Sequence, residues 1–328
     1  MLAAEELDAV SVITPNRFHA PLVLEALKGF VEADRKECPD DPPLVYDFTQ
    51  QDNAEFLCLC PDCRREIARY DRGDGHAQGG DAGLQLAFVN RLARDIRATY
   101  PDVIIRTFAY NSTECAPKPG TISVEPNVRI WWCDLYSRSD HTVPLETSGH
   151  FNAARAQTLK DWLALTDNVE IWDYMLYDAT YPEVSVRAIA RDIGLFASGH
   201  VPAVFIESEY ADQPFYELNF YVASKLMVDP SLKLSALVRT FCRGYGKGAE
   251  DMYRAIGRLG VRMMEGRSRT TREWDSRTMP WLDDASALKE LLSDVMAAYE
   301  KEPDAVIRGR IVRVIASVHR RLMTVYHK

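Results

Sequence analysis

The chain has 328 residues, of which 47% are hydrophobic and 27% are charged, which is the composition of an ordinary globular protein. Its formal net charge of −9 argues against a nucleic-acid partner and against binding to an anionic membrane, because both attract basic proteins. The chain has no run of about 18 apolar residues that could span a bilayer. Its acidic beginning, MLAAEELDAV, does not resemble a secretory signal peptide. We therefore expect a cytoplasmic protein.

Short apolar runs alternate with segments of helical period between residues 43 and 228. The runs are apolar almost throughout, which is typical of strands buried on both faces of a sheet. The expected strands are Leu44–Gln50, Val103–Tyr110, Val128–Asp134, Val169–Met175 and Val201–Ile206, with a further short strand at Val10–Ile13.

Helices are expected between these strands and after the last of them. The predicted helices are Pro21–Ala33, Leu84–Tyr100, Asn152–Leu165, Val184–Ser198, Phe215–Met227, Leu232–Tyr245, Ala249–Glu265, Asp284–Tyr299 and Ala305–Tyr326. Alternation of strands and helices predicts a parallel sheet with right-handed crossovers. We therefore expect an α/β fold, a (β/α) TIM-type barrel that is incomplete at its N-terminus, over residues 1–230. A helical domain is expected over residues 231–328.

Three glycine-rich or polar segments are interpreted as connections. Gly73–Gly83 is predicted to be a flexible loop rather than a phosphate-binding loop, because no strand leads into it and no Gly-Lys-Ser follows. The segment 244–248 is predicted to be a turn between helices, and Gly266–Pro280 a surface loop.

Acidic side chains follow four of the five main strands. In (β/α) barrels the catalytic groups lie at the C-terminal ends of the strands, so Asp52, Asp134, Asp173 and Glu207 become candidates. Aromatic rings can cover the C–H face of a sugar, and glycoside hydrolysis needs a pair of carboxylates. The alternative for each acid is that it caps the next helix or lies in a solvated loop.

The hydrolase interpretation assigns a role to each residue. Asp52 is the candidate general acid, because we expect apolar surroundings to raise its pKa, and Asp173 or Glu207 is the base or nucleophile. The predicted sugar-binding residues are Tyr110, Trp132, Trp172, Tyr174 and Glu209. No cofactor is expected to take part in catalysis.

Three cysteines lie close together as Cys58, Cys60 and Cys63. A C-x-C-x-x-C pattern can hold zinc through thiolates, with Cys38 or His76 as the candidate fourth ligand. The alternatives are a redox-sensitive cluster, or small side chains that shape a loop.

Several motifs occur here in a familiar order. They are DFTQQDNAEFLCLCPDC, LAFVNRLARDIRATYPDVIIRTFAY, NVEIWDYM, ELNFYVASKLMVDP and CRGYGKGAEDMY. Over roughly residues 10–265 the chain resembles the bacterial family called domain of unknown function 4838. Gln51 stands where that family usually has asparagine. The resemblance implies a carbohydrate-active barrel similar in architecture to α-glucuronidases and β-hexosaminidases.

The functional expectation is a glycoside hydrolase that acts on a carbohydrate through paired carboxylates. The alternative is a non-catalytic carbohydrate-binding or scaffold protein on a truncated barrel. A zinc-dependent hydrolase is a third reading, disfavoured because all-thiolate zinc sites are usually structural. Because the resemblance starts in the middle of the family's barrel, we expect either a missing N-terminal segment or a homo-oligomer that pairs the open sheet edges.

Overall fold

The computed structural model describes residues 19–50, 58–73, 78–134, 140–174, 182–208, 214–264 and 284–326. The predicted strand Val10–Ile13 and the predicted loop Gly266–Pro280 lie outside these ranges, as do Asp52, His76 and Glu209.

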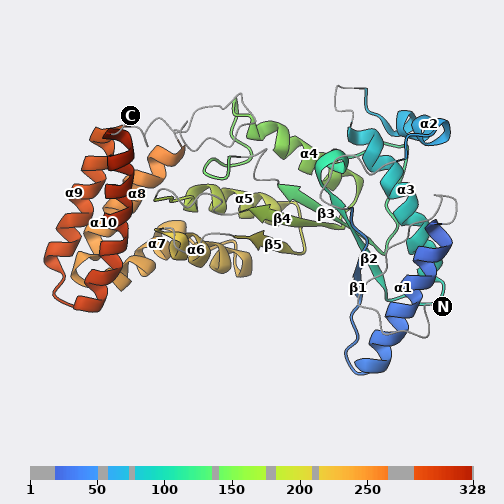
Figure 1. Ribbon diagram of the computed structural model, residues 1–328, viewed down its shortest axis with the longest axis horizontal. Coiled ribbons are helices and arrows are strands. Elements are labelled where there is room, and N and C mark those ends of the chain that lie inside the picture. The colour runs from blue at the N-terminus through green and yellow to red at the C-terminus, as the bar shows by residue number, and fades with distance from the viewer. Residues whose placement is uncertain are drawn as a thin grey trace. The chain divides into compact units, whose positions relative to one another are not determined.

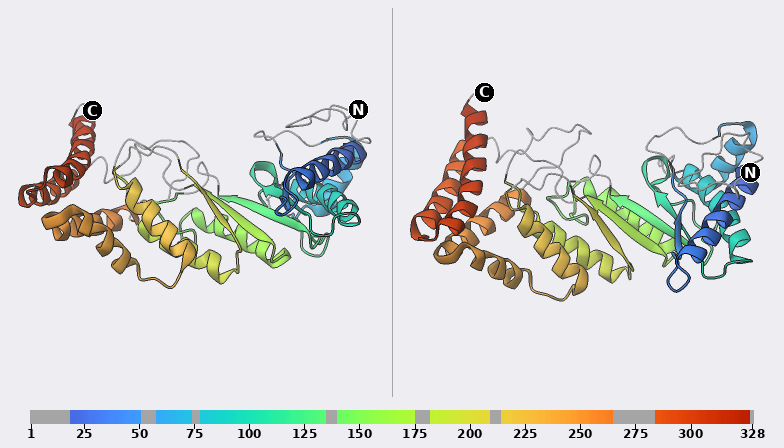
Figure 2. Two further views of the ribbon diagram at one scale, coloured as in Figure 1. Left: turned by 90° about the horizontal axis from the view of Figure 1, so that it is seen from below. Right: turned by 60° about the horizontal axis from the view of Figure 1, so that its bottom comes forward.

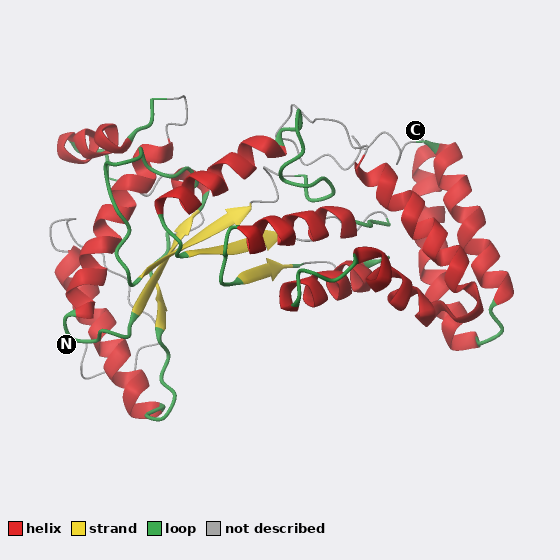
Figure 3. Ribbon diagram, turned by 180° about the vertical axis from the view of Figure 1, so that it is seen from behind, coloured by secondary structure: helices red, strands yellow, loops and turns green. Residues whose placement is uncertain are grey.

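The strands form one five-stranded parallel sheet (Figures 1 and 3). They are β1 (Val45–Asp47), β2 (Ile104–Ala109), β3 (Val128–Asp134), β4 (Val169–Tyr174) and β5 (Val204–Glu207). Their order in the sheet is β1-β2-β3-β4-β5, so each strand lies beside the next one in sequence. This is the order that consecutive right-handed strand–helix units produce.

The helices confirm most of the predicted helical segments. Their bounds are α1 (His19–Glu37), α2 (Pro61–Tyr70), α3 (Gln78–Arg97), α4 (Asn152–Leu165), α5 (Val186–Ser198), α6 (Tyr216–Val228), α7 (Leu234–Cys242), α8 (Ala249–Met264), α9 (Ala285–Lys301) and α10 (Ala305–Tyr326), with short 3-10 turns η3 (Asn111–Thr113) and η4 (Arg243–Gly248). Helices α9 and α10 lie side by side at the C-terminal end of the chain, as Figures 1 and 2 show from different directions.

The α/β class is confirmed, whereas the predicted TIM-type barrel is not. In the described part of the chain the sheet ends at β1 and at β5, so both strands are edges. A closed TIM-type barrel has eight strands and no edge.

The prediction of a flexible loop at Gly73–Gly83 is wrong in its second half. Helix α3 begins at Gln78 and contains three of the glycines, Gly79, Gly80 and Gly83. Helix α2 packs against this part of α3 so closely that a Cβ on Gly83 would lie 2.2 Å from the Cβ of Tyr70. A Cβ on Gly80 would lie 2.6 Å from the backbone oxygen of Ile67. The glycines are therefore needed for close helix packing rather than for flexibility.

The predicted turn at residues 244–248 is confirmed as η4, between α7 and α8. Gly246 has φ +57° there, and a Cβ at this position would collide with the Glu302 carboxylate, which accepts a hydrogen bond from the Lys247 amide. Both the positive φ and the close carboxylate require glycine.

The chain divides into two compact units. The first comprises residues 1–133 and 158–171, and the second comprises residues 134–157 and 172–328. Within the second unit one buried apolar cluster extends from α5 and α6 into α7, α8, α9 and α10. The predicted boundary at residue 230 stays a prediction.

Candidate functional site

The C-terminal ends of β3 and β4 bring two of the strand-end carboxylates together. Asp134 is the last residue of β3, and Asp173 lies near the end of β4. His141, from the segment after β3, lies between them, with its Nδ1 3.1 Å from Asp173 Oδ1 and 3.8 Å from Asp134 Oδ2. One possible ligand atom of each residue lies within 4.8 Å of the other two. We call Asp134, His141 and Asp173 the aspartate–histidine cluster.

This cluster carries its own positive charges. Burial lowers the pKa of His141, but the hydrogen bond with Asp173 and the charges of Asp134, Asp173 and Asp140 outweigh that effect and raise it to about 9. Arg155 on α4 is buried and places its Nε 3.4 Å from Asp134 Oδ1. The positive charges of His141 and Arg155 therefore offset the negative charges of Asp134 and Asp173.

A hydrogen-bonded loop fixes the position of His141. The Asp140 amide donates to Asn152 Oδ1 at 2.9 Å, and Asn152 Nδ2 donates to the carbonyl oxygens of Asp140 and Val143. Because Asn152 begins α4, the residue before His141 is tied to the start of that helix. The backbone on both sides of His141 is therefore held by Asn152, and its side chain is held by the ion pairs with Asp134 and Asp173.

A further carboxyl group lies near the cluster. Asp192 on α5 is buried and accepts a hydrogen bond from the Leu145 amide at 2.9 Å. Burial raises the pKa of Asp192 well above its usual range, and the negative charges of Asp173 and Asp134 act in the same direction. The Asp192 carboxyl therefore holds a proton more strongly than an ordinary aspartate does.

A second group of side chains surrounds Trp172 on β4. Its indole Nε1 donates to Glu207 Oε2 at 2.9 Å. The Trp172 ring meets Phe205 edge-on at 4.7 Å and lies nearly parallel to Tyr174 at 6.3 Å, measured between ring centroids. Phe205 is 46% exposed. We call Trp172, Tyr174, Phe205 and Glu207 the aromatic platform, which combines an exposed ring with a carboxylate held in place.

The two groups use opposite faces of β4. Successive side chains of a strand point to opposite faces, so Asp173 faces away from Trp172 and Tyr174. Asp173 and Glu207, the two alternative candidates for the base or nucleophile, therefore have different partners: Asp173 pairs with His141, and Glu207 pairs with Trp172. The rule that selected acids at the ends of apolar runs cannot predict which face of the sheet an acid occupies. A shift of one residue along a strand moves a side chain to the opposite face.

The remaining predicted sugar-binding residues lie in the first unit. Trp132 is fully buried and donates its indole N–H to Thr158 Oγ1 on α4 at 3.1 Å, so its ring is not available to a sugar in this structure. Its neighbour Trp131 is half-buried and carries the Arg106 guanidinium 3.7 Å above its ring. Tyr110 follows β2 and accepts a hydrogen bond at its carbonyl oxygen from Gln50 Nε2 at 2.8 Å.

Charged residues inside the predicted strands form a network that the sequence analysis did not single out. Arg106 on β2 makes two hydrogen bonds to Asp47 on β1, at 2.6 and 2.9 Å. Glu170 on β4 is buried and accepts from Arg106 at 3.2 Å and from Arg129 on β3 at 2.6 Å. A sequence signal for this network did exist: each of the four strands β1 to β4 carries a charged residue within its apolar run, and the residues that pair have charges of opposite sign.

The three neighbouring cysteines do come together. The Sγ atoms of Cys58, Cys60 and Cys63 all lie within 4.8 Å of one another, and all three residues are free thiols. Cys38, one of the two candidates for the fourth ligand, is not part of this group, and His76 lies outside the described residues. The group has the donor type that zinc prefers.

The sequence analysis included Asp134 among the strand-end acids but gave it no role, and it did not identify His141 or Arg155. Asp134 could have been found by the same rule that selected Asp173. His141 and Arg155 lie 7 and 21 residues beyond Asp134 with no motif spacing, so only the folded chain reveals their contacts with it.

Comparison with models of protein families gives a match. In the described ranges no helix is both long enough and apolar enough to cross a membrane. No curated protein matches the chain. The model of the family described as domain of unknown function DUF4838 matches residues 21–256, which is most of the chain and confirms the resemblance seen in the motifs. The chain belongs to the DUF4838 family.

Proposed function

We propose that this protein is a glycoside hydrolase whose substrate binds at the aromatic platform, with Glu207 as one of its catalytic carboxylates. We also propose that the five-stranded sheet is part of a (β/α) barrel. The observation that carries the proposal is the hydrogen bond from Trp172 to Glu207 beside the exposed Phe205 ring, at the C-terminal end of β5.

The platform has the chemical features that a sugar requires. The exposed Phe205 ring offers an apolar face for the C–H groups of a pyranose, and Glu207 offers acceptors for hydroxyl groups. The indole N–H holds one oxygen of the carboxylate in a fixed orientation, which limits the reorganisation needed when a sugar binds. Parallel α/β proteins also bind ligands outside the carboxyl ends of their strands.

Hydrolysis requires a second carboxylate. We propose Asp52 as the general acid and Glu207 as the base or nucleophile, with Glu209 and Tyr110 as further contacts to the sugar. Asp173 keeps a different role in this proposal: paired with His141, it holds the end of β4 that carries Trp172 and Tyr174.

A non-catalytic carbohydrate-binding protein is the second candidate. It is favoured by the pairing of Asp173 with His141 on the face opposite Trp172, which takes one of the two candidates for the base or nucleophile away from the platform. The platform would serve binding equally well, so only measurements of turnover and of binding on the same protein distinguish the two candidates.

The test uses the full chain with a panel of aryl glycosides and glycans. Glu207→Gln should lower kcat by about 100-fold or more and leave sugar affinity within a few-fold, because a general acid–base group contributes that much to the rate. Glu300→Gln, an exposed glutamate on α9, is the matched control and should retain full activity. Phe205→Ala should weaken binding of the same sugar.

The outcomes separate the candidates. Binding that Phe205→Ala abolishes, without turnover of any glycoside in the panel, supports the binding protein and contradicts the hydrolase. Turnover that Glu207→Gln leaves unchanged removes Glu207 from the mechanism. If the protein neither binds nor hydrolyses any sugar in the panel, both candidate functions are contradicted.

A further inference from the structure

The group formed by Cys58, Cys60 and Cys63, here called the tri-cysteine cluster, has the geometry of a metal site. Its three sulfur atoms lie within 4.8 Å of one another. Thiolates on one tetrahedral zinc, with zinc–sulfur bonds of about 2.3 Å, lie about 3.8 Å apart. Movements of about 1 Å therefore bring all three sulfurs onto one ion without changing the backbone path.

The backbone around the cluster is already ordered. Arg64 Nε donates to the Leu59 carbonyl oxygen at 2.8 Å, and the Arg64 amide donates to the Cys60 carbonyl oxygen at 2.9 Å. Pro61 follows Cys60 at the first helical position, where its fixed φ favours the start of α2. The loop that presents the three thiols is therefore shaped by contacts that do not involve them.

Helix α2 also lacks an apolar anchor at the end where the cysteines lie. Tyr70, at the last position of α2, is the residue of this helix that is buried, and it packs against Gly83 of α3. At the opposite end Cys60 is exposed. A metal bound by the three thiolates would anchor that end of the helix.

From these observations we infer that Cys58, Cys60 and Cys63 bind one zinc ion as thiolates, and that the ion fixes the start of α2. On binding, three S–H bonds break, three Zn–S bonds form, and the three protons pass to solvent. The inference goes beyond the proposed hydrolase function and does not depend on it, since the ion has a structural role.

The experiment measures metal content and ligand type on the full chain. Protein from zinc-supplemented culture, purified without chelator, should contain about one zinc per chain, and Cys60→Ser should contain at least 10-fold less. Cys38→Ser, an exposed cysteine outside the cluster, is the matched control and should retain the wild-type amount. Cobalt added to metal-free protein should produce the near-ultraviolet charge-transfer band of cobalt–thiolate bonds, in the wild type and in Cys38→Ser.

Two results would overturn the inference. One is wild-type protein with less than a tenth of an equivalent of zinc and no cobalt–thiolate band. The other is a disulfide between two of the three cysteines in freshly purified protein, seen as two thiols that resist alkylation until reductant is added. Because metal content and the cobalt spectrum need no substrate, they stand whether or not the protein hydrolyses sugars.

Discussion

The two clusters of metal-ligand side chains differ in how they balance charge. In the aspartate–histidine cluster, His141 and Arg155 supply positive charge to Asp134 and Asp173. In the tri-cysteine cluster all three possible ligands are thiols, none of which can carry a positive charge. Closely spaced ligand atoms therefore have two explanations, an internally neutralised ion network and a site that needs a cation, and the charges around them decide between the two.

Burial sharpens this contrast. Asp134 and Arg155 are almost inaccessible, so an ion would have to displace buried partners to reach them. Cys60 is exposed, so an ion can reach the tri-cysteine cluster from solvent. We therefore propose zinc for the cysteines and a structural role for the aspartate–histidine cluster. Three measurements test this division, and a fourth measures exposed ion pairs for comparison.

The largest expected effect comes from removing the buried carboxylate of Asp134. Asp134→Ala leaves Arg155 and His141 as buried cations with one partner fewer, and should lower the free energy of unfolding by about 3–5 kcal/mol. Urea denaturation measures the loss, and Asp167→Ala, at an exposed aspartate, is the control. A loss below about 1 kcal/mol would mean that the network does not stabilise the fold.

Zinc should stabilise the protein through the cysteines alone. At free zinc of about 100 times its Kd, binding to the folded state adds about 2.7 kcal/mol, which raises Tm by several degrees. Thermal unfolding with and without zinc measures the shift. Cys60→Ser should remove it, whereas Asp173→Asn should preserve it; a zinc shift that depends on Asp173 would instead assign the ion to the aspartate–histidine cluster.

The aspartate–histidine cluster should make stability depend on pH. The pKa of His141 is raised to about 9 in the folded protein from its usual 6.5, so its contribution is complete below about pH 6.5 and is lost as the pH rises through 9. Between about pH 6 and pH 8 the expected loss is about 2 kcal/mol. His141→Gln should lack this slope, and His319→Gln, at an exposed position on α10, should keep it. Identical slopes for the wild type and His141→Gln would contradict the raised pKa.

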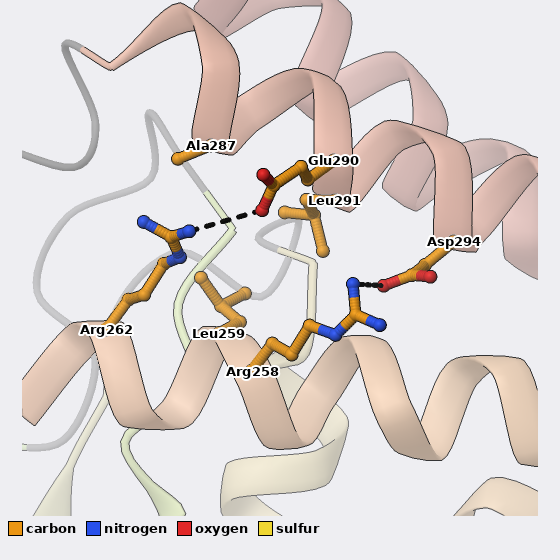
Figure 4. Close-up of a pocket in the computed structure, with 7 residues that line it drawn as sticks. All are labelled: Arg258, Leu259, Arg262, Ala287, Glu290, Leu291 and Asp294. Carbon is orange, nitrogen blue, oxygen red and sulfur yellow. Dashed lines mark hydrogen bonds and ion pairs between the residues drawn. The ribbon is translucent and has the colours of Figure 1, made fainter.

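The smallest effect is expected at the ion pairs between α8 and α9. Figure 4 shows Arg262 paired with Glu290, at 3.2 Å, and Arg258 paired with Asp294, at 3.0 Å, on either side of a small pocket. Because Arg262 and Glu290 are both partly exposed, Arg262→Ala should cost less than about 1 kcal/mol. A double-mutant cycle with Glu290→Ala isolates the interaction energy of the pair. An interaction energy as large as the loss expected for Asp134→Ala would show that exposure to solvent does not weaken this ion pair.

Periodicity predicted the elements well where burial was uniform. The bounds of β3, α4 and α10 agree with the prediction to the residue, because their apolar patterns start and end abruptly. Helix α2 was not predicted, since it buries only Tyr70 and is held by packing on the glycines of α3. The glycines of α3 were interpreted as a loop because glycine is common in loops. The local sequence does not show that another helix packs closely against them.

The sequence by itself determined the α/β class, the family, the strand ends that carry acids, and the gathering of three cysteines within six residues of chain. All of these depend on spacing along the chain. Only the tertiary structure decided that Asp173 lies on the face opposite Trp172, that Trp132 is buried under α4, and that His141 joins two aspartates. Those outcomes depend on strand pleating and on contacts between distant segments, and neither leaves a trace in local sequence order.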